Sequence, residues 1–195
     1  MKTYFLHPSL LLIAAIAISS CSNNNDIERH INYFAVGQEL KIPLTKGVII
    51  DSGKIPNVSY TAHLMNVDFM DEGVAFDPYT NTFSGIGNRV NIKFIVPEDR
   101  LITTGTYTFN SVDTIPFTNV TDSIPFTFNS GFVEENYDYT NLTGHHHVII
   151  GGTLIVISDG FNYDFTLNCS LSTGFNFVGT FKGNMTYYDL ENLKK

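Results

Sequence analysis

The sequence predicts an all-β domain made of antiparallel strands, and three observations support this fold class. Apolar and polar residues alternate with a period of two along several segments, as in a strand with one buried face. Aromatic residues make up 13% of the chain, with 16 Phe, 10 Tyr and no Trp, among many Thr, Asn and Gly. These residue types favour strands and turns, and only residues 189–195 carry a faint helical pattern.

The clearest strands lie in the last third of the chain. Residues 161–169 alternate between Phe, Tyr, Leu or Cys and a polar residue, and residues 90–96 and 175–187 follow the same pattern. In the last segment Gly179 and Gly183 flank Phe181 on the apolar face. Glycine at such a position predicts a bend, or a place where a neighbouring aromatic ring lies on the backbone.

The apolar run at residues 153–157 predicts a more central strand, and Ser158-Asp159-Gly160 predicts a hairpin turn after it. Further strands are predicted at residues 32–36, 40–44, 47–51, 60–69, 106–110, 124–132 and 146–150. About ten short strands joined by Gly, Asn and Asp turns are typical of a sandwich or a barrel. We expect a single domain over residues 31–195, an antiparallel two-sheet β-sandwich of jelly-roll type, with a calycin-like β-barrel as the alternative.

Residues 1–20 have the features of a secretion signal. Lys2 precedes an apolar run at residues 10–18, which is too short to span a bilayer but has the length of a signal h-region. The following I-S-S-C ends at Cys21 and resembles the lipobox of bacterial lipoproteins, with an aliphatic residue, two small residues and a cysteine. The resemblance implies lipidation of Cys21; an ordinary secretion signal with a chance cysteine is the alternative.

Residues 21–30 are predicted to form a flexible polar tether. Asp26 and Glu28 lie in this segment. It loosely resembles the acidic segment that directs lipoproteins of the Bacteroidota to the cell surface. We therefore expect lipid anchorage to the outer membrane with surface display, while a periplasmic orientation stays open.

The chain is acidic, with 11 Lys and Arg against 19 Asp and Glu and a formal net charge of −8. Loss of Lys2 with the signal brings the mature chain to −9. An acidic surface repels phosphate backbones and anionic headgroups, which argues against nucleic acid as a partner and leaves membrane contact to the lipid. If Cys21 is acylated, Cys169 has no partner for an internal disulfide.

The tract His145-His146-His147 is the most prominent local motif. Imidazoles bind transition metals, but neighbours in a strand point to opposite faces, so only His145 and His147 could share an ion. A third ligand would have to come from His63, His30 or a carboxylate. There is no HExxH or comparable spacing, and a polar strand entry is the favoured interpretation, so we predict no metal and no cofactor.

Two acidic clusters occur, one with Asp68, Asp71, Glu72 and Asp77 and the other with Glu134, Glu135 and Asp138. They lack the DxDxDG pattern of a calcium loop, and we expect solvated carboxylates. There is no G-x-S-x-G motif, and Cys169 continues the inward phase of its strand with no neighbouring cation. The sequence therefore contains no catalytic constellation, and we predict that the protein is not an enzyme.

A short duplication places DTIPFT at residues 113–118 and DSIPFT at residues 122–127. Both copies match the D-[ST]-[AILVMT] acceptor pattern for O-glycosylation in Bacteroidota. Thr114 and Ser123 are the predicted acceptors, because a hydroxyl on an exposed, proline-stiffened loop is accessible to a transferase. Two exposed turns without modification are the alternative.

Several turn-and-strand motifs extend along the mature chain. They are NYF.VG..L.I at residues 32–42, G.GN.V.I.F at 85–94, G.YTF at 105–109, GGTL.V at 151–156 and F.G.F.G at 177–183. Together they resemble a group of cell-envelope lipoproteins of the Bacteroidota. The resemblance implies fold and location and transfers no catalytic residue.

The leading functional hypothesis is a non-enzymatic extracellular module that binds a glycan, a small ligand or a protein. A structural or assembly subunit of a surface complex or fimbria-like structure is the alternative, and a hydrolase has the least support. Sugar sites use exposed aromatic faces, and the chain offers Tyr137, Tyr139, Tyr187 and Tyr188. We expect most of the aromatic residues to fill the β-core instead.

Overall fold

The computed structural model describes residues 32–37, 41–54, 62–97, 102–111 and 127–193. The predicted signal, Cys21, the tether and the predicted acceptors Thr114 and Ser123 lie outside these ranges. No helix among the described residues is long and apolar enough to cross a membrane.

The described chain is almost entirely β-structure, which confirms the predicted fold class. The strands are β1 (Tyr33–Val36), β2 (Ile42–Pro43), β3 (Lys46–Lys54), β4 (Ala62–Met70), β5 (Val74–Asp77), β6 (Thr82–Pro97), β7 (Gly105–Phe109), β8 (Thr127–Asp138), β9 (Thr143–Ser158), β10 (Asn162–Leu171), β11 (Asn176–Asn184) and β12 (Thr186–Asp189). The faint helical pattern near the C-terminus corresponds to the short helix α1 (Leu190–Leu193).

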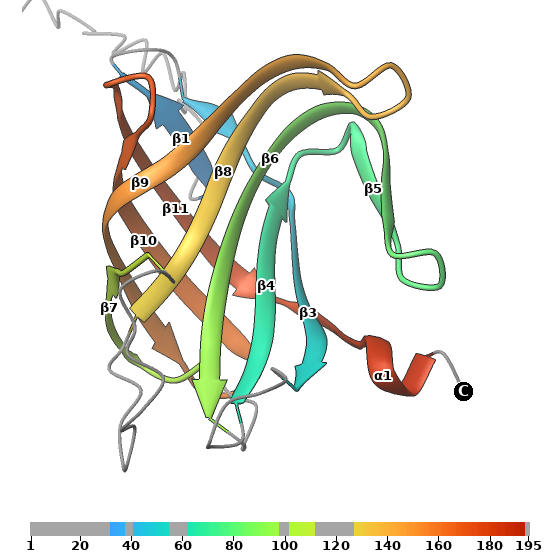
Figure 1. Ribbon diagram of the computed structural model, residues 1–195, viewed down its shortest axis with the longest axis vertical. Coiled ribbons are helices and arrows are strands. Elements are labelled where there is room, and N and C mark those ends of the chain that lie inside the picture. The colour runs from blue at the N-terminus through green and yellow to red at the C-terminus, as the bar shows by residue number, and fades with distance from the viewer. Residues whose placement is uncertain (1–31, 38–40, 55–61, 98–101, 112–126, 194–195) are drawn as a thin grey trace, which may run out of the picture.

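The strands form one large, curled sheet (Figure 1). Its order is β12-β3-β4-β6-β8-β7-β9-β10-β11-β1-β2, with β5 paired to β6 and a further pairing of β8 with β9. The pairs β12–β3 and β7–β8 are parallel and the other pairs are antiparallel, so the sheet is mixed. The order of the described strands has two ends, β12 and β2, so this sheet is not closed and neither the predicted sandwich nor the predicted barrel is confirmed. The prediction of a purely antiparallel arrangement was wrong, because β12 and β7 each run parallel to a neighbour.

The strand boundaries differ from the prediction in two informative places. Strand β9 is continuous where two strands were predicted, because Gly152 adopts a φ of +119° and the pairing with β10 continues past it. The predicted strand 175–187 is divided at Met185, because β11 pairs with β10 and β1 whereas β12 pairs with β3. Strand β5 was not predicted.

The predicted turn at residues 158–160 is confirmed as the β9–β10 hairpin. Asp159 Oδ1 accepts hydrogen bonds from the backbone N–H groups of Phe161 at 2.9 Å and Asn162 at 2.7 Å. Gly160 has a φ of +94°, which only glycine adopts without strain. Local turn chemistry therefore fixes the register in which β9 and β10 pair.

The main core lies inside the curl and is rich in phenylalanine. Its largest fully buried rings are Phe34, Phe69, Phe94, Phe128, Phe165 and Phe177. The ring of Phe181 lies against the backbone of Gly47 on β3, where a Cβ atom would be only 2.8 Å from the ring. The contact was predicted at Gly179 and Gly183, whereas the close approach occurs at Gly47, which also faces the side chain of Met185.

A second, smaller core lies on the outer face of β3 and β4. It consists of the buried residues Val48, Ile50, Met70, Val74 and Leu190, with partly buried aromatic rings around them. Strand β5 and helix α1 lie on the same side of the molecule (Figure 1). They cover this outer face, so β3 is buried on both sides.

Candidate functional site

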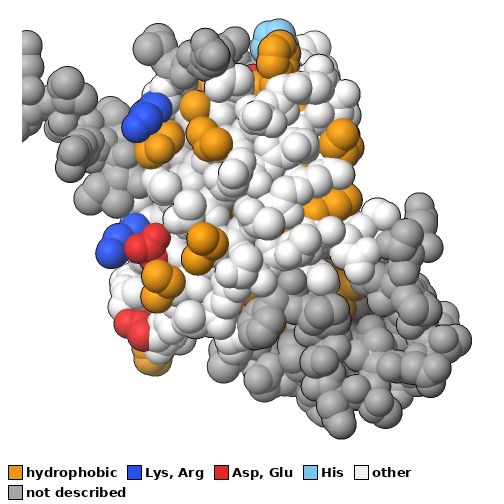
Figure 2. Space-filling view, turned by 90° about the vertical axis from the view of Figure 1, so that its left-hand side faces the viewer, with side chains coloured by type: hydrophobic (Ala, Val, Ile, Leu, Met, Phe, Trp, Pro, Cys, Tyr) orange, Lys and Arg blue, Asp and Glu red, His pale blue; other side chains and the backbone are white. Residues whose placement is uncertain are grey.

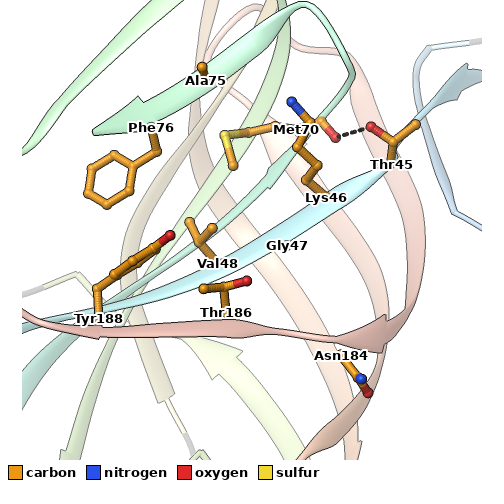
Figure 3. Close-up of a pocket in the computed structure, with 10 residues that line it drawn as sticks. All are labelled: Thr45, Lys46, Gly47, Val48, Met70, Ala75, Phe76, Asn184, Thr186 and Tyr188. Carbon is orange, nitrogen blue, oxygen red and sulfur yellow. Dashed lines mark hydrogen bonds between the residues drawn. The ribbon is translucent and has the colours of Figure 1, made fainter. Parts of the chain in front are cut away.

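A cleft of about 430 Å³ opens between β3, β5 and the β11–β12 segment (Figure 3). It is lined by Thr45, Lys46, Gly47, Val48, Met70, Ala75, Phe76, Asn184, Thr186 and Tyr188. The rings of Phe76 and Tyr188 gather at one end, with centroids 5.4 Å apart, while Thr45 and Asn184 lie at the other. The cleft therefore has an aromatic end and a polar end.

Lys46 attaches β5 to β3 and places a positive charge beside the cleft. Its Nζ donates to the backbone carbonyl of Val74 at 2.8 Å and to that of Glu72 at 3.4 Å. Lys46 is exposed, and no described carboxylate forms an ion pair with it. In an acidic protein, this cation gives the polar end of the cleft a local attraction for anionic or hydroxyl-rich groups.

A series of rings continues from the aromatic end of the cleft across the outer face of the sheet. Neighbouring centroids are 4.8 Å apart for Phe76 and Phe83, 6.0 Å for Phe83 and Tyr139, 5.1 Å for Tyr139 and Tyr137, and 6.5 Å for Tyr137 and His146. We call these rings, together with Tyr188, the aromatic ladder. All of them are half-buried except His146, which is exposed.

The four tyrosines named from the sequence are thus separated by the fold. Tyr137, Tyr139 and Tyr188 belong to the aromatic ladder, and Tyr139 and Tyr188 pack against the second core. Tyr187 is 46% exposed, and its hydroxyl donates to Asp51 Oδ2 at 3.0 Å. None of the four contributes to the main core, which contains Tyr107 and Tyr163 with the buried phenylalanines, as expected for most of the aromatic residues.

A buried charge cluster lies beneath the aromatic ladder. The Arg89 guanidinium is 3.4 Å from the ring centroid of Phe83 and 4.9 Å from that of Phe132. Its Nε donates to Asp68 Oδ1 at 2.8 Å, and its Nη1 lies 3.5 Å from Glu134 Oε2. The cation is thereby held between two rings and two carboxylates.

The prediction that the acidic clusters are solvated was wrong for three members. Asp68, Glu134 and Glu135 are 0%, 5% and 8% exposed. Asp68 and Glu134 are matched by Arg89, and Glu135 by His147, whose Nε2 lies 3.0 Å from Glu135 Oε2. The alternation in the sequence places these residues on the face opposite the main core, but it does not show that other segments cover that face.

Two acidic groups of the cluster, Asp68 and Tyr139, have raised pKa values. Burial raises the pKa of Asp68 even though Arg89 and Asn91 oppose the shift. Burial also raises the pKa of Tyr139, helped by the 2.5 Å hydrogen bond that its hydroxyl donates to Glu134. The raised pKa keeps the Tyr139 hydroxyl protonated at neutral pH, where it donates to Glu134.

The structure does not bring the predicted metal candidates together. His145 and His147 share a face, with stacked rings 6.1 Å apart, as predicted from strand geometry. Across the sheet, His147 on β9 pairs with Val133 on β8, which pairs with Val90 on β6, which pairs with Phe69 on β4. His63 lies six residues along β4 from Phe69, so it does not face the histidine tract. Within the described part of the chain, no group of three His, Cys, Asp or Glu residues is arranged to hold a metal ion. His30 lies outside that part.

His63 belongs instead to a buried network that the sequence did not reveal. Its Nδ1 lies 3.1 Å from Asp51 Oδ1, and both residues are 0% exposed. Asp51 also accepts from the backbone N–H of Gly53 and from the Tyr187 hydroxyl. The network links β3, β4 and β12 through side chains far apart in sequence.

Cys169 lies in the main core at 2% exposure, as its inward phase predicted. Burial raises the pKa of its thiol to about 12. We expect iodoacetamide at about pH 8 to leave Cys169 unmodified in the folded protein and to alkylate it after unfolding in guanidinium, because only the thiolate reacts. Peptide mass spectrometry measures both states, and equal alkylation rates would contradict this assignment.

Comparison of the chain with protein-family models, curated proteins and solved structures finds no match.

Proposed function

We propose that this protein is a lipid-anchored cell-envelope module that binds a glycan without chemical turnover. The observation that carries the proposal is the cleft whose aromatic end joins the aromatic ladder while its other end presents hydroxyl, amide and ammonium groups. Sugars have apolar C–H faces and hydroxyl-rich edges, which such a site complements. The lipidation of Cys21 is proposed from the I-S-S-C motif alone.

The sheet topology favours the barrel alternative over the two-sheet sandwich. Only Met185 separates β11 from β12, and β12 pairs with β3 at the opposite end of the strand order. The chain thereby joins β11, the third strand from one end of the order, to β12 at the other end of one continuous sheet, whereas a sandwich would divide the strands between two facing sheets.

Assembly by addition of a strand from another chain is the second candidate function. The end strand β2 argues against it. Strand β2 has two residues, one of which is Pro43. Proline has no N–H to donate, and short strands ending in proline blunt the edge of a sheet. We therefore place glycan binding ahead of assembly.

Binding of the full chain to an array of defined neutral and uronic-acid-containing oligosaccharides tests the proposal. We expect Tyr188→Ala and Phe76→Ala to weaken the affinity for a retained oligosaccharide about tenfold or more, because each removes a stacking surface. Lys46→Met should weaken uronic-acid ligands more than neutral ones.

Tyr79→Ala is the matched control, since Tyr79 is 78% exposed and does not line the cleft. It should bind as the wild type does. Thermal unfolding of each variant separates loss of the site from loss of the fold, because Phe76 and Tyr188 also pack on the second core. Retention of no oligosaccharide, or an equal loss in Tyr79→Ala, would refute glycan binding in the cleft.

A further inference from the structure

The outer face of β9, β10 and β11 differs in charge from the rest of this acidic chain. The three strands contain two charged residues, Asp164 and Lys182. These two pair with each other, with Lys182 Nζ 3.4 Å from Asp164 Oδ2. The strands therefore carry no net formal charge in a chain whose total is −8.

The same face exposes apolar side chains. Val148, Ile150, Ile155 and Ile157 of β9 are 44%, 55%, 47% and 59% exposed, and Val178 of β11 is 39% exposed. This side of the molecule shows separated apolar side chains among mostly uncharged polar surface (Figure 2).

The β9–β10 hairpin adds the most exposed apolar side chain of the face. Phe161 is 82% exposed at the end of the turn. Beside it lies a hollow of about 490 Å³, whose lining includes Ile157, Asp159, Asp164 and Lys182. An aromatic ring next to charges of both signs is suited to the interface of a zwitterionic bilayer, where rings lie at headgroup depth.

The start of the described chain lies next to this face. Asn32 Oδ1 accepts from the backbone N–H of Lys182 at 2.6 Å, and Asn32 Nδ2 donates to the carbonyl of Lys182 at 3.2 Å. Cys21 precedes Asn32 by 11 residues. A chain of that length spans at most about 36–40 Å, so a lipid on Cys21 would keep Asn32, beside this face, within that distance of the bilayer.

We propose that the outer face of β9–β11, with the Phe161 turn, is the surface on which the domain rests on the lipid bilayer. This inference depends on the lipid anchor of the proposed function. With the anchor in place, weak contacts between this face and the bilayer are enough to keep the face bound, because tethering gives it a high effective concentration at the membrane. The near-zero charge of the three strands avoids the repulsion that the rest of the chain would experience at an anionic surface.

This orientation also leaves the cleft accessible. Strand β10 and the later part of β9 lie on one side of the molecule, β5 and α1 lie on the opposite side, and the beginning of β9 arches over the top toward β5 (Figure 1). A domain that rests on β9–β11 therefore keeps the aromatic end of the cleft, at Phe76 and Tyr188, away from the bilayer, while Asn184 at the polar end belongs to β11.

The absence of tryptophan from the chain permits a direct test. Phe161→Trp places a single fluorophore in the proposed contact, and Leu142→Trp places one at the opposite end of β9, where Leu142 is 71% exposed. The two positions flank the 16-residue strand β9, so they are about 50 Å apart along the strand. Each full-length lipidated variant is reconstituted into phosphatidylcholine and phosphatidylethanolamine vesicles with brominated acyl chains.

We expect the Trp at position 161 to shift to the blue and lose about half of its emission to brominated lipid, since interfacial side chains lie about 5–10 Å into the boundary region. The Trp at position 142 should keep its emission. Equal quenching at both positions, or none at 161, would overturn the proposal. A blue shift at 161 without quenching, with a doubled mass, would assign the face to a second copy and overturn it as well.

Incorporation of labelled palmitate tests the lipid anchor separately from the membrane-facing surface. Wild-type chain that takes up label, while Cys21→Ser does not, establishes the anchor independently of the fluorescence. If the wild type takes up no label, the anchor fails and the membrane-facing surface fails with it. If label is present and position 161 is not quenched, the surface alone fails and the anchor and the cleft are unaffected.

Discussion

Replacing Arg89 with methionine is expected to lower the free energy of unfolding by about 3–5 kcal/mol, because it leaves buried carboxylates without their cation. Arg89 is 11% exposed, while the side chains of its partners Asp68 and Glu134 are 0% and 6% exposed. Urea unfolding followed by circular dichroism measures the change. Loss of the guanidinium also removes the stacking on Phe83 and Phe132, so the aromatic ladder should loosen in the same variant.

Lys182→Met is the matched control for Arg89→Met. Lys182 and Asp164 form an ion pair at 3.4 Å, but their side chains are 66% and 36% exposed. Solvent-exposed pairs contribute about 0–1 kcal/mol, so this variant should unfold close to the wild type. A loss below about 1 kcal/mol in Arg89→Met would mean that the cluster relaxes, for example by protonation of Asp68, and would refute the stabilising role of Arg89 in the buried charge cluster.

Gly152→Ala is expected to destabilise the fold by about 2–5 kcal/mol, because the new methyl group would combine backbone strain with overpacking. Gly152 has a φ of +119°, a conformation that alanine rarely adopts. A Cβ atom there would overlap the backbone oxygen of Asn168 and the Cα of Cys169 on β10. These backbone atoms belong to the β9–β10 ladder and cannot move aside as a flexible side chain does. Thermal and urea unfolding report the change.

The neighbouring Gly151 is a stringent control for this prediction. A Cβ atom at Gly151 would have only the Ser170 Cβ within reach, at an ordinary 3.9 Å, and its φ is not positive. Gly151→Ala should therefore change stability by no more than about 1 kcal/mol. Equal losses in the two variants would show that strand flexibility, and not the close approach of β9 to β10, determines the effect.

The C-terminal strands were predictable because their information is local. The alternation from Phe161 to Cys169 places alternate side chains on one face, and the structure buries Tyr163, Phe165 and Cys169 as that period requires. Phe161 was predicted on the same face but is 82% exposed, because it lies in the turn before β10 begins at Asn162. The β9–β10 turn was equally predictable, because Asp159 and Gly160 supply the hydrogen bonds and the backbone conformation that it needs.

Partner choice between strands was not predictable, because it is decided by contacts between distant segments. Residues 175–187 alternate without interruption, yet at Met185 the chain leaves β10 and β1 and begins to pair with β3. The approach depends on Gly47, whose missing side chain gives room to Phe181. A glycine some 130 residues upstream carries no signal in the local pattern of the strand.

The candidate site was predictable only in its residue types. Tyr137, Tyr139 and Tyr188 were considered as sugar-contacting residues, and the acidic clusters of Asp68 and Glu134 were noted. The register of β4, β6 and β8 brings Asp68 and Glu134 to one outer face. Strand β5, which has four residues and no clear pattern, packs on that face with Tyr139 and Tyr188. Its position converts an outer face into a second core with a cleft at its margin.

The sequence alone determined that the chain is all-β, the main hairpin and the inward residues of the alternating segment 163–169, because side-chain period and turn chemistry act within a few residues. Tertiary structure alone decided the continuous sheet, the buried Asp68–Arg89–Glu134 cluster, the separation of His63 from the histidine tract, and the cleft. These features arise where strands distant in sequence meet, and burial and pairing across such contacts are properties of the whole chain.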